Sequence, residues 1–210
     1  METSLTEISE DALTDRVFAN PTWRVTVGLP PLATSHWEHR LRVDLPRDPN
    51  TGRTRGDVDI LAIPPGDAAN STASEVKCIR VAESAFRTGE PNGLANWLKG
   101  IGQANRLAQR GFSQVYIYLF VAIDSRANNE GRFTYKGATP ELLERIRSAL
   151  QLERLDPRIG FVENAFVQPV DRPPFELGTT SSSIVRMATR VEQPPDVTKW
   201  VEAQFRASAN

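Results

Sequence analysis

The longest apolar run of the chain, from Val115 to Ile123, sets the firmest limit on the fold. It is nine residues long and contains two tyrosines. A helix that crosses a membrane needs about 18 apolar residues or more, so this run is too short to be one. Its length and its β-branched and aromatic content favour a buried β-strand. The sequence therefore predicts a sheet built around a buried strand, and no contact with a membrane.

Strands and helices alternate along the rest of the chain. Gly111 and Pro140 are suited to end one predicted helix and to begin the next. The predicted helices span residues 3–19, 94–110, 140–155 and 197–207, and the other predicted strands span 23–29, 36–45, 57–63, 73–81, 160–167 and 184–191, with a polar loop over 125–137. This order predicts an α/β fold, with a mixed central sheet flanked by helices.

The length of 210 residues predicts a single domain, 1–210, with its core at about 55–168. The segment 169–195 is rich in Pro, Ser and Thr and is predicted to be irregular. A net charge of −1 argues against coating nucleic acid by charge alone, so any phosphate binding needs a local patch. One cysteine, Cys78, and a polar N-terminus without a signal-peptide pattern predict a cytoplasmic protein.

Two neighbouring predicted strands carry the residues best suited to chemistry. The first contains Asp57 and Asp59, and the second contains Glu75 and Lys77. Side chains alternate faces along a strand, so Glu75 and Lys77 emerge on the same face. The loop between the strands is long enough for an antiparallel pair, which would set Asp59 beside them. Buried acids and a lysine need partners, and a hard cation such as Mg²⁺, with Mn²⁺ as a substitute, meets that need.

This pattern resembles the PD-(D/E)XK superfamily, which includes restriction endonucleases, Holliday-junction resolvases and RecB-type nucleases. The family has an acid on an apolar strand, then a Glu/Asp-x-Lys triplet, then a helix that often carries a glutamine. Asp59, Glu75-Val76-Lys77 and Gln103 stand at those places within residues 55–123. The proline of the family name is absent, and Gly56-Asp57 takes its position.

The resemblance implies a restriction-endonuclease-like fold and Mg²⁺-dependent hydrolysis of phosphodiester bonds, with DNA a better expected substrate than RNA. Asp59 and Glu75 would hold one or two Mg²⁺, with Asp57 as a further ligand or a structural neighbour. Lys77 would orient or help to deprotonate the attacking water. A chain without a separate reader domain suggests structure-specific cutting, or action as a homodimer or with a partner protein.

Basic residues near the triplet form a candidate nucleic-acid surface. They are Lys99, Arg106 and Arg110 on the predicted helix, with Arg53 and Arg55 before the first strand. Such a stripe can track a phosphate backbone, although a solvated helix face gives the same pattern. Ideal helical geometry points Gln103 away from the packed face, so its approach to the acids depends on the tilt of the helix.

Other interpretations stay open at this point. Glu-x-Lys on a strand is often a solvated ion pair, which would leave an unrelated α/β interaction protein. The same fold can also be a catalytically silent subunit of a DNA-processing or phage-defence assembly. Glu7, Glu10 or Glu38 would supply a third acid in some arrangements. A zinc site is disfavoured, because the two histidines at 36 and 39 fall on opposite faces of a strand.

Overall fold

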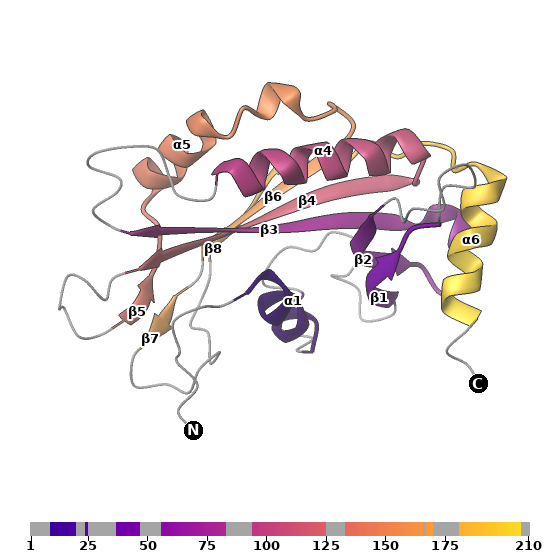
Figure 1. Ribbon diagram of the computed structural model, residues 1–210, viewed down its shortest axis with the longest axis horizontal. Coiled ribbons are helices and arrows are strands. Elements are labelled where there is room, and N and C mark those ends of the chain that lie inside the picture. The colour runs from indigo at the N-terminus through magenta and orange to yellow at the C-terminus, as the bar shows by residue number, and fades with distance from the viewer. Residues whose placement is uncertain are drawn as a thin grey trace.

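The computed structural model describes residues 9–19, 24, 37–46, 56–82, 94–124, 133–165, 167–169 and 181–206. These residues form a mixed β-sheet flanked by helices, which confirms the predicted α/β class (Figure 1). The elements in chain order are α1 (Glu10–Ala19), β1 (Glu38–Asp44), β2 (Asp57–Ile63), η1 (Ala68–Asn70), β3 (Thr72–Ala82), α4 (Leu94–Arg110), β4 (Gln114–Asp124), β5 (Phe133–Lys136), α5 (Pro140–Ala149), η3 (Leu152–Arg154), β6 (Gly160–Ala165), β7 (Gln168–Pro169), β8 (Ser181–Arg186) and α6 (Pro195–Arg206).

Strand β4 lies at the centre of the sheet, with β3 and β6 parallel to it on its two edges. Antiparallel strands extend both sides: β2 and then β1 beyond β3, and β8 beyond β6. The short strands β5 and β7 join at the far end of β4. Helix α4 is the crossover between the parallel strands β3 and β4, so it runs opposite to them on the sheet.

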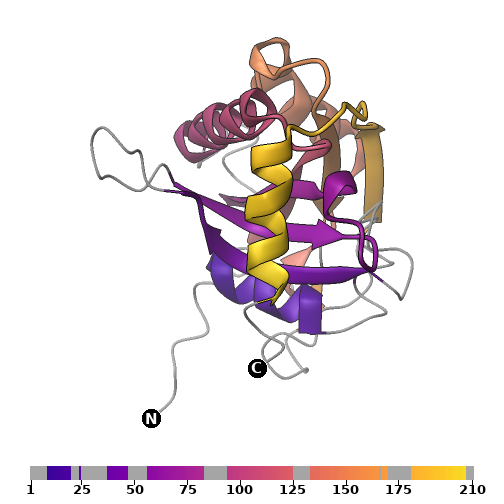
Figure 2. The same cartoon turned by 90° about the vertical axis from the view of Figure 1, so that its right-hand side faces the viewer.

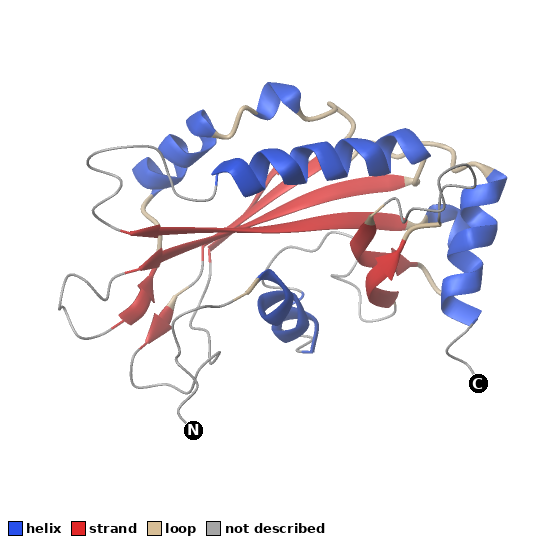
Figure 3. Ribbon diagram, viewed as in Figure 1, coloured by secondary structure: helices blue, strands red, loops and turns tan. Residues whose placement is uncertain are grey.

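The residue pattern of β4 explains its central place. Every residue of 115–123 is buried. Ile117 and Leu119 belong to a core that also contains residues of α4 and α5, whereas Tyr116 and Tyr118 belong to a core with residues of α1. We call the two sides of the sheet the α4 face and the α1 face. Figure 3 shows the helices on both sides.

Helix α6 lies across one end of the sheet, where it packs against η1 and β1 (Figure 2). The buried side chain of Gln193, just before α6, forms hydrogen bonds that hold α6 at this end of the sheet. Its amide nitrogen donates to Ala68 O at 2.8 Å, and its oxygen accepts from Ser113 N at 3.1 Å. These bonds tie α6 to the segment that leads into β3. No helix among the described residues combines the length and apolar character that crossing a bilayer requires.

The structure corrects the predicted end of one helix. Helix α5 ends at Ala149, not at residue 155. Gln151 has a left-handed backbone with φ of 49°, which an α-helix cannot accommodate, and the chain continues as the short helix η3. The sequence pattern missed this because the apolar spacing of the 3₁₀ turn continues that of the helix.

Two strands also differ from the prediction. Strand β8 covers residues 181–186, and residues 187–194 after it have no regular structure, although 184–191 was the predicted strand. Strand β5 lies within the predicted polar loop 125–137, where pairing with β4 and β7 outweighs the polar composition. The predicted strand 23–29, apart from residue 24, and the first residues of the predicted helix 3–19 lie outside the described residues.

A candidate site of two carboxylates and a lysine

The candidate site lies where β2 separates from β3. The two strands pair only from Ile60–Ser74 to Ala62–Thr72, although β3 continues to Ala82. Beyond that point the Asp59 carboxylate replaces a strand partner, because its Oδ2 accepts a hydrogen bond from Val76 N at 2.7 Å. An otherwise unpaired backbone amide is thereby satisfied, and Asp59 is fixed against β3.

The separation coincides with an irregularity in β1. Arg42, which lies opposite Asp59 in the register, has φ of 51°. Leu41 packs with the α1-face core and Val43 with the α4-face core, so the alternation of side chains reverses at Arg42. A left-handed backbone is costly for a non-glycine residue and marks a place where the surrounding structure imposes the shape. The β1–β2 hairpin therefore changes direction beside the site.

Glu75 and Lys77 lie on the α4 face of β3, as the strand period predicts. Their neighbours Ala73 and Ile79, two residues away on either side, belong to the α4-face core, whereas Val76 belongs to the α1-face core. The prediction that Asp59, Glu75 and Lys77 come together is consistent with this placement, because Asp59 holds the amide of the residue between them.

The Glu75 carboxylate is completely buried, with 0% of the residue exposed. Its Oε1 lies 2.8 Å from Lys77 Nζ, and its Oε2 has no hydrogen-bond partner among the described residues. Burial, followed by the negative charge of Asp59, raises the pKa of Glu75 to about 8. A carboxyl group in this environment resists ionisation unless another positive charge arrives.

Asp59 experiences the same environment to a smaller degree. Burial raises its pKa to about 6, while the hydrogen bond from Val76 N and the charge of Lys77 act in the opposite direction. Asp57, at the start of β2, adds negative charge that raises the pKa of both Asp59 and Glu75. The pKa shifts therefore place three carboxylates within electrostatic reach of one another.

Three oxygen atoms surround the ammonium group of Lys77. They are Glu75 Oε1 at 2.8 Å, Val76 O at 2.8 Å and Glu10 Oε2 at 3.2 Å. Burial alone would lower the pKa of Lys77, but the charges of Glu75, Glu10 and Asp59 outweigh it, so the pKa is raised and the lysine stays protonated. The N–H and C=O of one strand residue point to the same side, so Asp59 and Lys77 together occupy the open edge of β3 at Val76.

Glu10 is the third acid that the sequence left undecided. It lies at the start of α1, on the other face of the sheet, and reaches Lys77 at the edge that β2 leaves open. Glu38 pairs with Ile63, four residues along β2 from Asp59, so β1 holds it at the other end of the hairpin. Glu7 lies outside the described residues. Sequence spacing carried no signal for Glu10, because its approach depends on how α1 packs.

Gln103 is half-buried on α4, and its Oε1 is buried without a hydrogen-bond partner among the described residues. The expectation that it points away from the packed face is therefore wrong in part. One turn earlier, a Cβ atom at Gly100 would meet the Lys77 side chain, and α4 runs opposite to β3. Gln103 accordingly lies towards the Glu75 end of the triplet.

The predicted nucleic-acid-binding residues have different surroundings. Lys99 and Arg106 are exposed on α4. Arg110, at the end of α4, instead lines a cleft of about 320 Å³ with residues of α6, among them Asp196 and Trp200. Arg53 and Arg55 lie outside the described residues. Of the three basic side chains that the structure describes, Lys99 and Arg106 are thus open to solvent on the helix that covers the site.

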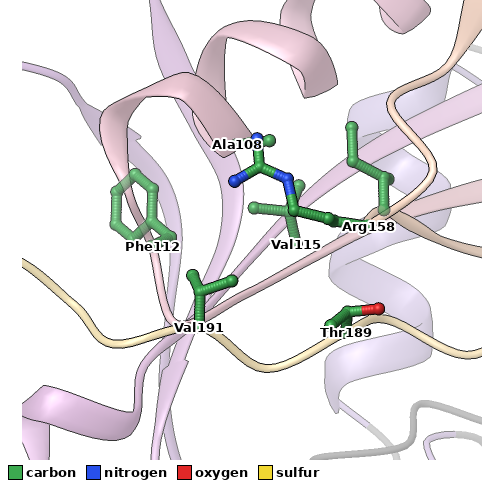
Figure 4. A pocket seen from close by; sticks show the side chains of 7 residues that line it. Ala108, Phe112, Val115, Arg158, Thr189 and Val191 are labelled. Carbon is green, nitrogen blue, oxygen red and sulfur yellow. The ribbon is translucent and has the colours of Figure 1, made fainter.

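Neither of the two hollows near the C-terminal end of α4 is lined by Asp59, Glu75 or Lys77. The cleft beside α6 is one. The other, shown in Figure 4, is lined by Phe112, Arg158 and five further residues and has a volume of about 10 Å³. That volume is room for about one water molecule, too little for a substrate. The carboxylates at the open edge of β3 therefore remain the candidate site.

Any cation at this site would be held by few protein ligands. Among the described residues, no three side chains of His, Cys, Asp or Glu are grouped to hold a metal ion. Mg²⁺ commonly takes one or two protein carboxylates and keeps several water molecules. Asp59 and Glu75 are the two carboxylates that would serve as such ligands, and Glu75 Oε2 is buried and lacks a partner among the described residues.

No family model and no curated protein matches the chain. Among solved structures, the chain is similar to a protein of unknown function from Silicibacter pomeroyi, with 14% identity, a TM-score of 0.35, and 90% of this chain and 86% of that chain covered. It is also similar to SfsA of Pyrococcus furiosus in complex with Ca²⁺, with 12% identity, a TM-score of 0.28, and 85% of this chain and 64% of that chain covered. Likeness at this level identifies neither a family nor a function.

Proposed function

We propose that this chain is a Mg²⁺-dependent nuclease of the PD-(D/E)XK type that hydrolyses phosphodiester bonds, in DNA in preference to RNA. The observation that carries the proposal is the fully buried Glu75 carboxylate beside Asp59 and Lys77, with one oxygen that lacks a partner among the described residues. Burying such a group is unfavourable unless a ligand compensates. If Glu75 and Lys77 were only a solvated ion pair on the surface, Glu75 would not be buried.

Each residue has a distinct part in this proposal. Asp59 and Glu75 hold the divalent cation, and the Val76 amide keeps Asp59 in orientation. When bound, the cation lowers the pKa of water and offsets charge on the phosphate. Lys77 stays protonated, so it orients the attacking water and offsets charge that develops in the transition state. Asp57 adds negative charge that favours the cation.

The exposed basic residues of α4 suggest how nucleic acid approaches. Lys99 and Arg106 are exposed on the helix whose buried side passes over Lys77. Contacts from such residues to phosphates give binding that weakens as salt concentration rises. We therefore expect the backbone of the substrate to follow α4, with the scissile phosphate at the open edge of β3.

The test is cleavage of supercoiled plasmid DNA and of RNA with Mg²⁺, by the wild type and by Asp59→Asn and Lys77→Ala. Loss of at least about a hundredfold in rate is expected for both variants, the usual cost of removing a group that acts in the transition state. Lys199→Ala on α6 is the matched control, since Lys199 is exposed and distant in the chain from the site, and it should cleave at the wild-type rate.

If the wild-type protein binds DNA but cleaves neither substrate with Mg²⁺ or Mn²⁺, the proposed nuclease function is wrong. That result would favour the catalytically silent subunit instead. Equal activity of the wild type and Lys77→Ala would also contradict the proposal, because a cleaving contaminant or a different site would then be responsible.

A further inference from the structure

Helix α4 passes over Lys77 with a glycine. A Cβ atom at Gly100 would lie 2.7 Å from Lys77 Cγ, 2.8 Å from Cε and 3.0 Å from Cδ. Real Cβ atoms essentially never approach carbon so closely, so any other residue at position 100 would have to displace the lysine side chain. The helix is continuous through Gly100, so the backbone conformation itself does not require glycine there. Glycine is otherwise unfavourable inside a helix.

Lys77 is held at both ends of its side chain. Its backbone pairs with Leu119 of β4 in the middle of the sheet. Its ammonium group contacts oxygens of Glu75, Val76 and Glu10. The aliphatic part between these ends therefore has little freedom to move sideways. A displacement of that part would draw the ammonium away from at least one of its oxygens.

We propose that Gly100 is a positioning residue: the missing side chain at this point of α4 makes the space in which the aliphatic part of Lys77 lies, and so holds its ammonium at Glu75 and Val76. The consequence for catalysis rests on the proposed nuclease function. The positioning of Lys77 does not, and it has readouts of its own.

Helix α4 offers a matched control at Gly102. A Cβ atom there would meet Arg106 Nη1 at 3.7 Å, which is ordinary van der Waals contact. Gly100→Ala and Gly102→Ala are therefore the same substitution in the same helix, two residues apart. Both gain the intrinsic helix preference of alanine over glycine, but only Gly100→Ala disturbs Lys77.

The first experiment measures the reactivity of the Lys77 amine in the metal-free protein, by limited acetylation and mass spectrometry. The Lys77 side chain is 11% exposed in the wild type. Gly100→Ala should raise its rate of acetylation severalfold, whereas Gly102→Ala should leave it unchanged, with exposed Lys199 as the internal reference. Equal Lys77 rates in the two variants would overturn the proposal.

The second experiment compares melting temperatures and shows whether Gly100 acts through Lys77. Gly102→Ala should raise the melting temperature in any background, and Gly100→Ala should not do so in the wild type. In a Lys77→Ala background, Gly100→Ala should raise the melting temperature as Gly102→Ala does, because the obstructing side chain is gone. A Gly100→Ala effect that is the same in both backgrounds would overturn the proposal, because the alanine would then clash with something else.

The third experiment is cleavage of plasmid DNA with Mg²⁺. Gly100→Ala should lower kcat between about tenfold and a hundredfold with KM unchanged, the size of effect that a misplacement of about 1 Å produces. Gly102→Ala should match the wild type. Equal kcat values in the two variants would overturn the proposal. A wild type without activity would remove the proposed function alone, and acetylation and melting would still decide the role of Gly100.

Discussion

Glu75 on β3 and Glu163 on β6 are the two buried glutamates among the described residues, at 0% and 1% exposed. Both lie on the α4 face, since the register aligns Lys77, Leu119 and Glu163 across three strands. Each has a basic partner. Glu163 Oε2 accepts from Arg147 Nε at 2.9 Å and Nη2 at 2.6 Å, and Arg147 comes from α5 on the same side of the sheet.

The two glutamates differ in the charges around them. Burial raises the pKa of Glu163, but its arginine opposes the shift and only Glu144 adds negative charge. Glu75 shares its lysine with Glu10 and lies near Asp59 and Asp57, and its pKa rises to about 8. Burial of an acid therefore does not by itself make a site. A concentration of like charge with too little positive charge is what the proposed cation site requires.

The largest expected difference between the two residues is in catalysis. Glu75→Gln should lower the rate of plasmid cleavage by about a hundredfold to ten-thousandfold, because it removes a cation ligand at the reacting phosphate. Glu163→Gln should retain cleavage and lose stability instead, since Arg147 loses its buried charged partner and keeps only exposed Glu144. Initial rates at fixed Mg²⁺ and urea unfolding measure the two effects. Similar losses of cleavage rate in both variants would contradict a catalytic role for Glu75 and a structural role for Glu163.

The second-largest expected difference between the two glutamates is in cation binding. Mn²⁺ at about a hundred times its dissociation constant should stabilise the wild type by about 3 kcal/mol, as expected for a ligand that binds only the folded state. Glu163→Gln should show the same stabilisation and Glu75→Gln should show almost none. Urea unfolding with and without Mn²⁺ provides the measurement. Stabilisation that persists in Glu75→Gln would place the cation elsewhere.

The pH dependence of stability should sharpen the comparison without any cation. A carboxyl group with a raised pKa in the folded protein contributes stability that is present at low pH and lost as pH rises through that pKa. Burial raises the pKa of Glu75 from 4.5 to about 8 and that of Asp59 from 3.8 to about 6, so the free energy of unfolding should fall from about pH 4 to about pH 8 by on the order of a few kcal/mol, with the part above pH 6 due to Glu75.

Glu75→Gln should abolish most of that fall between pH 6 and 8, whereas Glu163→Gln should keep it. Unfolding in urea at several pH values, with a chelator present, supplies the comparison. A wild-type protein whose stability is level across this window would show that Glu75 is already ionised and compensated without a cation.

The smallest expected effect belongs to Glu10. Its side chain is 36% exposed and lies 3.2 Å from Lys77 Nζ, so solvent screens the ion pair. Glu10→Gln should cost less than about 1 kcal/mol of stability and lower cleavage only a few-fold. Asp11→Asn, its exposed neighbour on α1, is the control. A loss as large as that of Glu75→Gln would make Glu10 a full member of the site.

Much of the site could be predicted from local pattern. The apolar strand 57–63 coincides with β2, and 94–110 coincides with α4. The two-residue period of a strand is enough to predict that Glu75 and Lys77 share one face. These features depend on neighbours in the sequence, so the chain reveals them directly.

Other features depend on packing. Asp59 bonds to the Val76 amide only because the pairing of β2 with β3 stops at Ile60 and Ser74, beside the left-handed Arg42. The burial of Gln103 depends on the placement of α4 over β3. The fit of a glycine at position 100 likewise depends on the position of Lys77.

The sequence by itself determined the elements and the alternation of side chains along them, because these follow from backbone geometry over a few residues. The tertiary structure alone decided how deeply Glu75 is buried and which charges surround it. Desolvation and electrostatic interaction depend on distances through space, and those distances are set by the packing of α1, β2, β3 and α4 against one another.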